Sequence, residues 1–341
     1  MGFIALIVAL LIEQGRSLPA DNWVHRMVLA LADLVRSSTD AGQRQHGLVG
    51  FVVLAVVMLA VVLVLDWLAG MVHPALRLLV HIAVLYFTLG FRQFSQTFTE
   101  MQVALAADDT PGARRVLDRW VAQNAADEGS DRPERDTSVH EICRRAIAHA
   151  LVGAHRNVFG PLFWYVVLPG AIGPVLYRLA ELLSQRWSKP ASETPEAARA
   201  QAAGIGVPAV VAVRSEPEPY GLVATVVYQV LDWLPVRLSA AGFAIMGNFE
   251  DAIYCWRGAV SAETGREQRA LLLAAGGGAL GLRVAEPELE ARWASGEHGF
   301  EFQGVLPDAS GLRSGVGLVW RSVLLWLGLY AMLTLAAWLG R

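Results

Sequence analysis

Residues 220–247 read YGLVATVVYQVLDWLPVRLSAAGFAIMG, an apolar run long enough for a membrane helix that carries Asp232, Pro235 and Arg237 near its middle. A charge at the centre of a bilayer costs about 2.5–3.5 kcal/mol on insertion scales, and such residues usually face a protein interior or a watery cavity. The motif LDWLPVRL (231–238) is therefore interpreted as part of a functional or structural core within the membrane.

The composition of the whole chain also indicates a membrane protein. Of its 341 residues, 54% are hydrophobic and 17% are charged, and the mean hydropathy is +0.41. Soluble domains usually contain about 25% charged residues. The net charge is −3 and no Lys/Arg-rich run is present, so the expected partner is a lipid bilayer and a nucleic-acid partner is not supported.

Apolar runs of about 20 residues place the expected membrane spans. Residues 47–71 form the clearest span, and residues 73–90 follow it after a tight turn, which predicts a helical hairpin. Residues 317–339 predict a C-terminal span with Arg321 near one end. The first twelve residues lack a preceding basic residue and a small-residue cleavage site, which predicts an uncleaved, short first helix.

The apolar segment 159–183, FGPLFWYVVLPGAIGPVLYRLAELL, contains Pro161, Pro169 and Pro174. Proline removes a backbone donor and clashes with the preceding turn, and broken helices persist at membrane depth only where protein or water satisfies the freed carbonyls. This segment and the one around Pro235 are expected to be broken and to pack together. Two ordinary kinked helices remain the alternative.

The predicted fold is all-α, a polytopic helical membrane protein with proline-broken helices and helical cytoplasmic segments. Sustained period-two alternation is absent, so strands are not predicted. In chain order the expected regions are an N-terminal helix, an amphipathic helix and a transmembrane hairpin (1–90), a cytoplasmic helical region (91–158), two proline-broken membrane segments with a disordered linker at 188–219 (159–247), a cytoplasmic helical region (248–313) and a C-terminal transmembrane helix (314–341).

Basic residues predict the orientation of the chain in the membrane. Residues 91–156 carry nine Arg, which places them on the cytoplasmic side and the N-terminus outside. If both proline-containing segments cross, the linker 184–219 lies outside. That linker carries four basic residues, so re-entrant segments remain the alternative.

Two helix starts are predicted in the cytoplasmic regions. Thr110 as cap and Pro111 in the first turn predict a helix through Trp120. Ser138 and Glu141 have the spacing of a capping box.

The sequence does not support a nucleotide-binding, metal-binding or catalytic motif. Gly276, Gly278 and Gly281 have the spacing of a dinucleotide fingerprint, but EQRALLLAA before them reads as a helix, so a flexible break between helices is favoured. The three neighbouring histidines (140, 149 and 155) have no Cys or carboxylate at metal-ligand spacing, so no metal is predicted. Catalytic residues are not identified, and no cofactor is predicted from these patterns.

Three motifs together carry a family resemblance: GPLFW (160–164), LPGAIGPVLYR (168–178) and LDWLPVRL (231–238). The chain resembles the membrane family that joins AmpE with the CobD/CbiB cobalamin-biosynthesis proteins, and AGGGALGLRV (275–284) extends the resemblance toward the C-terminus. The residues that match the two main motifs are Pro161, Leu162, Phe163, Trp164, Trp233 and Pro235.

The two branches of this family imply different functions. CobD/CbiB proteins are adenosylcobinamide-phosphate synthases, which join an aminopropanol arm to a corrinoid carboxylate by an ATP-dependent amide ligation. AmpE is an inner-membrane accessory protein linked to sensing of β-lactam or cell-wall stress. Either resemblance implies a multi-pass protein of the bacterial inner membrane.

The site positions distinguish the branches. The Glu-Asn-x-x-Asp motif of the synthase branch falls on Val152, Gly153 and Arg156, and a later Asn and Asp fall on Glu181 and Ser184. The exchange of Asp for Arg removes a carboxylate that could hold Mg²⁺. The resemblance at these positions therefore favours the AmpE branch.

This comparison makes a non-enzymatic sensor or accessory factor in the cell-envelope or β-lactam response the main hypothesis, with envelope or signalling proteins as expected partners. The alternative is a cobalamin-biosynthesis protein, which the GALGLRV stretch (278–284) favours. ATP, Mg²⁺ and a corrinoid are expected only under that alternative. The oligomeric state is left open.

The polar core is expected to contain Asp232 and Arg237. On a regular helix they lie about 140° apart, but a kink at Pro235 could bring them together or point each at another helix. A structural ion pair or brace is favoured because buried charges are normally paired, and ligand binding is the alternative. The candidate partners from the other proline-containing segment are Arg156, Arg178 and Glu181.

Overall fold

The computed structural model describes residues 2–15, 22–39, 44–90, 92–124, 138–188, 219–261, 268–295, 302 and 304–340. Helices account for almost all of these residues, and the one strand-like pairing among them is an isolated bridge between Leu282 and Val305. The all-α prediction is confirmed. The linker expected at 188–219 lies outside the described residues except for Ser188 and Pro219, which end and begin helices.

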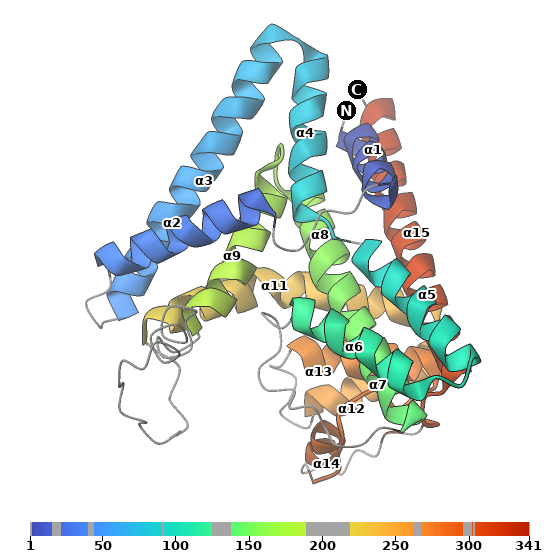
Figure 1. Ribbon diagram of the computed structural model, residues 1–341. Coiled ribbons are helices and arrows are strands. Elements are labelled where there is room, and N and C mark those ends of the chain that lie inside the picture. Colours follow the sequence, from blue (N-terminus) through green and yellow to red (C-terminus); the bar gives the residue numbers. More distant parts are fainter. Residues whose placement is uncertain are drawn as a thin grey trace, which may run out of the picture.

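Helices α1 (Gly2–Gly15), α3 (Arg44–Val72), α4 (Pro74–Thr88) and α15 (Ala309–Leu339) extend toward the same end of the molecule, where α1 starts and α15 finishes (Figure 1). Helices α3 and α4 form the predicted hairpin. Among the described helices, α3, α15 and α11 (Pro219–Met246) are long and apolar enough to cross a membrane. The chain is therefore a polytopic helical membrane protein.

The segment 159–183 is broken, as predicted. Helix α7 (Val139–Ala154) runs through a π-helical turn, η1 (His155–Phe159), into α8 (Gly160–Val167), and α9 (Ile172–Ser188) returns alongside α8. The chain reverses at residues 168–171, where Gly170 has a φ of +71°, a conformation that glycine adopts without strain. Pro169 occupies this turn, and Pro174 lies in the first turn of α9, where no helical donor is lost.

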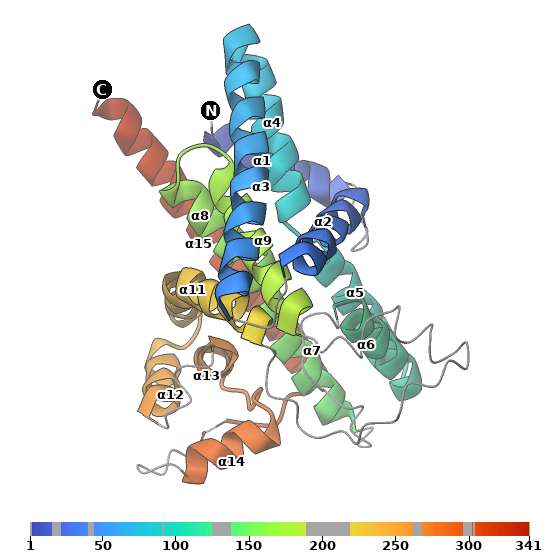
Figure 2. The ribbon, with the colours of Figure 1, turned by 90° about the vertical axis from the view of Figure 1, so that its left-hand side faces the viewer.

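Helix α11 does not break, contrary to the expectation, and continues through Pro235. It packs along α9, as expected for the two proline-containing segments. It runs transverse to α3 and α15, crossing beneath them in Figure 1 and lying nearly end-on in Figure 2. Helix α2 (Trp23–Thr39) is also inclined across α3, with which it packs.

The lower part of the molecule is a helical region with α7 at its centre. The surrounding helices are α5 (Arg92–Ala106), α6 (Thr110–Asn124), α12 (Phe249–Ser261), α13 (Gln268–Leu280) and α14 (Pro287–Ser295). The N-cap half of the predicted capping box is confirmed, since the Ser138 hydroxyl accepts the Glu141 amide at 3.3 Å at the start of α7. The Glu141 carboxylate accepts from Arg144. At the start of α6, Asp109 and not Thr110 accepts the free Gly112 amide, at 2.9 Å.

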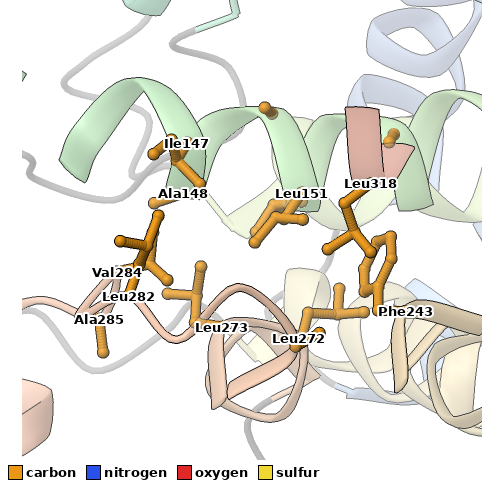
Figure 3. Packing of buried hydrophobic residues seen from close by; sticks show 14 of the residues in the cluster. Ile147, Ala148, Leu151, Phe243, Leu272, Leu273, Leu282, Val284, Ala285 and Leu318 are labelled. Atoms are coloured by element: carbon orange, nitrogen blue, oxygen red, sulfur yellow. The ribbon is translucent and has the colours of Figure 1, made fainter. Parts of the chain in front are cut away.

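The largest hydrophobic cluster joins α7 to α11, α13 and α15. Figure 3 shows Ile147 and Leu151 of α7 facing Leu272 and Leu273 of α13, with Phe243 of α11 beside them. Full burial of each such side chain contributes about 1.5–3 kcal/mol. A second cluster joins α2, α3, α9 and α11, and a third joins α1, α4 and α8.

The glycine-rich stretch is a packed part of α13, so the flexible break expected there is wrong. A side chain at Gly276 would strike Leu151 of α7, and one at Gly278 would strike the backbone of α12. The glycines therefore allow neighbouring helices to approach closely. Gly276 and Gly278 lie inside α13 and Gly281 follows its last residue, so a helix and not a strand precedes the motif, which excludes the strand–turn–helix order of a dinucleotide fingerprint.

Candidate functional site

The two family motifs meet through a hydrogen bond that explains why α11 stays intact. Proline at position 235 cannot donate to the carbonyl four residues earlier, that of Leu231. The indole Nε1 of Trp164 donates to this carbonyl at 3.2 Å. A side chain of GPLFW therefore replaces the backbone donor that the proline of LDWLPVRL removes, and the helix continues without a break.

Asp232 is 1% exposed and accepts two hydrogen bonds from elements outside α11. His155 Nε2 and the Tyr177 hydroxyl each lie 2.8 Å from its Oδ1. His155 Nδ1 lies 2.9 Å from the hydroxyl of Ser239, which is about two turns after Asp232 on α11. In the tautomer that carries its proton on Nε2, His155 donates to Asp232 and accepts from Ser239 through Nδ1. The network joins η1 and α9 to α11.

The π-helical turn places His155 in this network. The extra residue of a π turn shifts side chains around the helix axis, and such turns are frequent at functional sites. The Gly160 amide donates to the His155 carbonyl five residues earlier, and Pro161 follows immediately. A Cβ at Gly160 would overlap the Tyr177 ring, so glycine at this position lets α9 bring Tyr177 against Asp232.

Arg178 and Glu181 form a second part of the polar core, next to the first. The Arg178 guanidinium donates to Glu181 at 2.7 Å, to Asn157 Oδ1 at 2.7 Å and to the Thr88 carbonyl at 2.7 Å. These bonds connect α9 to η1 and to the end of α4. Glu181 is buried, so its charge is compensated by Arg178, whose side chain remains 27% exposed.

Arg156 lies beside the same network and is partly exposed. Its charge acts on the Tyr228 hydroxyl, as do the charges of Asp232 and Glu181. Tyr228 in turn lies 3.4 Å from the Tyr177 hydroxyl. Four of the five expected core residues therefore gather at the junction of η1, α9 and α11.

Arg237 lies apart from this junction. Its guanidinium stacks over the Trp233 ring at 4.1 Å from the centroid and donates to the Trp233 carbonyl at 2.8 Å. The two residues are on the open side of α11, whereas Asp232 is on the packed side. Because α11 is not broken at Pro235, the helical spacing keeps Asp232 and Arg237 on different faces.

The remaining motif residues support the packing of α8. Leu162 is buried against α1 and α4. Phe163 packs edge-on against Trp164, with ring centroids 5.2 Å apart. Pro161 is buried in the first turn of α8, where proline is tolerated.

A separate polar cluster neutralises the charges of the α3–α4 hairpin. Asp66 accepts from Arg77 Nη2 at 2.9 Å, and His81 Nε2 lies 3.1 Å from its Oδ1. The other ring nitrogen of His81 lies 2.9 Å from the Tyr165 hydroxyl of α8. The polar residues of both predicted spans are thus paired with one another.

Comparison with known proteins identifies the family. The family model described as CobD/Cbib protein matches residues 3–188, more than half of the 341 residues. The chain belongs to the CobD/CbiB family. It is 29% identical over 331 residues to the cobalamin biosynthesis protein CobD of Stutzerimonas stutzeri (strain A1501), covering 94% of this chain and 93% of that protein.

A second CobD/CbiB relative is the cobalamin biosynthesis protein CobD of Chromobacterium violaceum. It is 29% identical over 212 residues, which cover 62% of this chain and 57% of that protein. No solved structure matches the chain. Both relatives carry the CobD name, so the comparisons favour the cobalamin alternative over the AmpE-like sensor that the site positions suggested.

The residues present do not fit the magnesium and ATP phosphates that the CobD/CbiB synthase activity implies. Val152 packs in the hydrophobic core, and Arg156 brings a positive charge where the synthase branch has Asp. Glu181 is bonded to Arg178, and Asp232 to His155 and Tyr177. Among the described residues no group of three or more His, Cys, Asp or Glu side chains is arranged to hold a metal ion.

The three neighbouring histidines are each engaged in separate contacts. His140 Nδ1 lies 2.9 Å from the Pro307 carbonyl. His149 packs edge-on against Trp120, with ring centroids 4.5 Å apart. His155 bonds Asp232, so the three do not converge on one site.

The sequence analysis missed the two partners of Asp232, His155 and Tyr177, and missed Ser239, which bonds His155. One signal was present: Tyr220, Tyr228 and Asp232 share the four- and eight-residue spacing of a single helix face. That face predicts a polar stripe pointing into the protein. The π turn that brings His155 to it has no signal of this kind.

Proposed function

We propose that the protein acts in cobalamin biosynthesis at the bacterial inner membrane, where it binds a corrinoid intermediate through an anionic group of that intermediate. The similarity to a protein named cobalamin biosynthesis protein CobD, which extends over 94% of this chain, carries the proposal. The family model matches the part of the chain that contains η1, α8 and α9.

Arg156 supports the choice of an anionic group. It is partly exposed at the edge of the buried network and stands where the synthase branch has an Asp. A carboxylate at that position would attract a phosphate or a carboxylate only through a bound cation. An arginine binds either anion directly, with two parallel hydrogen bonds. The exchange of charge thus replaces a metal-mediated contact with a direct one.

The buried part of the network has a supporting role in this proposal. His155 and Asp232 are each 1% exposed and are bonded to one another and to α9, so they hold η1 in place and with it Arg156. Because the nearby carboxylates are already paired, the proposed function is corrinoid binding without amide ligation at this site.

The test is a titration of the purified protein in lipid nanodiscs with a corrinoid that has free side-chain carboxylates, followed by the visible absorbance of the corrinoid. We expect saturable binding that EDTA does not change. A hydrogen bond to a charged group contributes about 1.5–3 kcal/mol, so Arg156→Gln should weaken binding about tenfold or more.

The matched control is Arg115→Gln, because the Arg115 side chain on α6 is 75% exposed and remote from the network. It should leave the affinity unchanged. Absence of saturable binding, or equal affinities for Arg156→Gln and the control, would refute the proposal. Growth rescue of a strain that lacks the synthase would show that the protein carries out the ligation itself.

A further inference from the structure

Helix α11 has one face packed into the protein and one open apolar face. On the packed face every fourth residue from Tyr220 to Ala240 is buried, including Asp232 of the network already described. On the open face each large apolar residue is at least 39% exposed; these residues are Val226, Val230, Trp233, Leu234, Leu238 and Ile245. A surface of this composition needs an apolar cover.

The two ends of α11 contact α3 near its start and α15 near its middle. Its first turn touches α3 at Gly47, where a Cβ would overlap the Tyr220 carbonyl and where the apolar run of α3 begins. Near its other end, a Cβ added at Gly242 would lie 3.4 Å from Nε1 of Trp326 on α15. Trp326 lies five residues after Arg321, which corresponds to a depth of about 7.5 Å at a rise of about 1.5 Å per residue.

Helices α3 and α15 run in the same direction, so these contacts decide how α11 lies. A helix that crossed the bilayer would begin beside one end of α3 and finish beside the opposite end of α15. Helix α11 instead meets α3 near its start and α15 near its middle, and Figures 1 and 2 show it transverse to both. Its axis therefore lies along the bilayer plane if α3 and α15 cross the membrane.

Trp233 and Arg237 are suited to the headgroup region. Tryptophan is enriched at membrane interfaces, and arginine reaches from apolar surroundings to phosphate groups. The Arg237 guanidinium rests on the Trp233 ring and uses one Nη to bond a backbone carbonyl. The open face around this pair is apolar, so lipid matches it better than a polar protein surface does.

We infer that α11 does not cross the membrane and is instead an interfacial helix, whose open face lies in the leaflet on the side of the arginine-rich segments and whose Arg237 binds the phosphate of an anionic phospholipid. Interfacial helices sink about 5–10 Å into the boundary between headgroups and acyl chains. The depth of Gly242 relative to Arg321 agrees with this range. The network around Asp232 would then lie at the membrane surface and not at its midplane.

Depth measurements test the inference directly. Single cysteines replace Val226, Val230, Leu234 or Ile245 of α11 in a chain whose native cysteines are changed to Ala. Each cysteine carries a fluorophore, and its depth is measured from fluorescence quenching in nanodiscs whose lipids are brominated at different depths. The first and last of these positions are about 28 Å apart along the helix. We expect their depths to agree within about 10 Å.

The matched control uses the exposed residues Leu324, Leu329 and Leu333 of α15, whose ends are about 14 Å apart along a helix taken to cross the bilayer. These depths should change steadily along the chain. A depth range above about 10 Å across α11, with α15 behaving as expected, overturns the inference that α11 is interfacial.

A second experiment tests the lipid phosphate. The melting temperature is measured in nanodiscs of phosphatidylcholine alone and with phosphatidylglycerol added. We expect the anionic lipid to raise the melting temperature of the wild type and of Arg115→Gln, and Arg237→Gln to lose most of this increase. An increase in Arg237→Gln equal to that of the control overturns the assignment of Arg237 to lipid.

Discussion

The hydrogen bond from Trp164 to the Leu231 carbonyl predicts that Trp164 and Pro235 are energetically coupled. In the wild type the carbonyl depends on the indole, because Pro235 has no N–H. In Pro235→Ala the new amide at 235 donates to the same carbonyl within the helix. Trp164→Phe should therefore destabilise the protein more when Pro235 is present than when it is replaced.

The magnitude follows from hydrogen bonds between membrane helices, which contribute about 0.6 kcal/mol on average and about 1.7 kcal/mol at most in double-mutant cycles. We expect a coupling energy of about 1 kcal/mol, because the bond is 3.2 Å long and only partly buried. Trp164→Phe also loses part of a ring that packs against α9 and α11. That loss occurs in both backgrounds and cancels in the cycle.

The assay is unfolding in mixed micelles with increasing SDS, followed by far-UV circular dichroism, for the wild type, Trp164→Phe, Pro235→Ala and the double variant. Independent sites add to within about 0.3–0.5 kcal/mol. A coupling energy below about 0.3 kcal/mol would refute the argument that the indole replaces the missing donor, and would leave Trp164 with a packing role alone.

Three further variants or treatments have defined outcomes, each measured on the purified protein. Gly160→Ala forces a Cβ into the Tyr177 ring and should lower the free energy of unfolding by about 1–3 kcal/mol. The control Gly317→Ala, whose Cβ would meet no neighbouring atom, should not lower it. Equal losses in the two variants would contradict the packing argument. Asp232→Ala leaves its buried histidine and tyrosine partners unpaired and should lower the free energy of unfolding by about 3–5 kcal/mol, more than Asp232→Asn does. Equal losses for the two variants in SDS unfolding would contradict a stabilising role for the Asp232 carboxylate. Burial raises the pKa of both Cys143 and Cys255 to about 12, so the reactive thiolate is scarce at pH 8 and becomes common only as the pH approaches 12. Mass spectrometry of the folded protein treated with an alkylating reagent at pH 8 should find both thiols unmodified. Rapid alkylation at pH 8 would contradict this expectation.

The membrane helices with uninterrupted apolar runs were predictable from the sequence. The runs at 47–71 and 317–339 became α3 and α15 because hydropathy alone decides that such segments are buried in lipid or protein. The break before α9 was predictable as well, because Gly170 and Pro169 share one turn.

The interaction that keeps α11 straight was not predictable from local sequence. The donor that satisfies the Leu231 carbonyl comes from Trp164, 67 residues earlier in the chain. The partners of Asp232 come likewise from η1 and α9. Proline and charge patterns predict that such partners must exist, because unpaired polar groups are costly, but they do not say which elements supply them.

The transverse orientation of α11 could not be predicted from the composition of the segment. Its length and apolar content meet the requirements for a membrane span. Two features distinguish it from such a span: Arg237 interrupts its open face, and its ends contact α3 near the start and α15 near the middle. Hydropathy averages over the faces of a helix, so it does not separate a crossing helix from one lying along the surface.

The most direct test of the central claim is the cobalamin content of cells from which the gene for this chain has been deleted. The account predicts that cobalamin falls, that the wild-type gene and Arg115→Gln restore it, and that Arg156→Gln does not. Unchanged cobalamin together with an altered response to β-lactams would contradict the account and support an AmpE-like role.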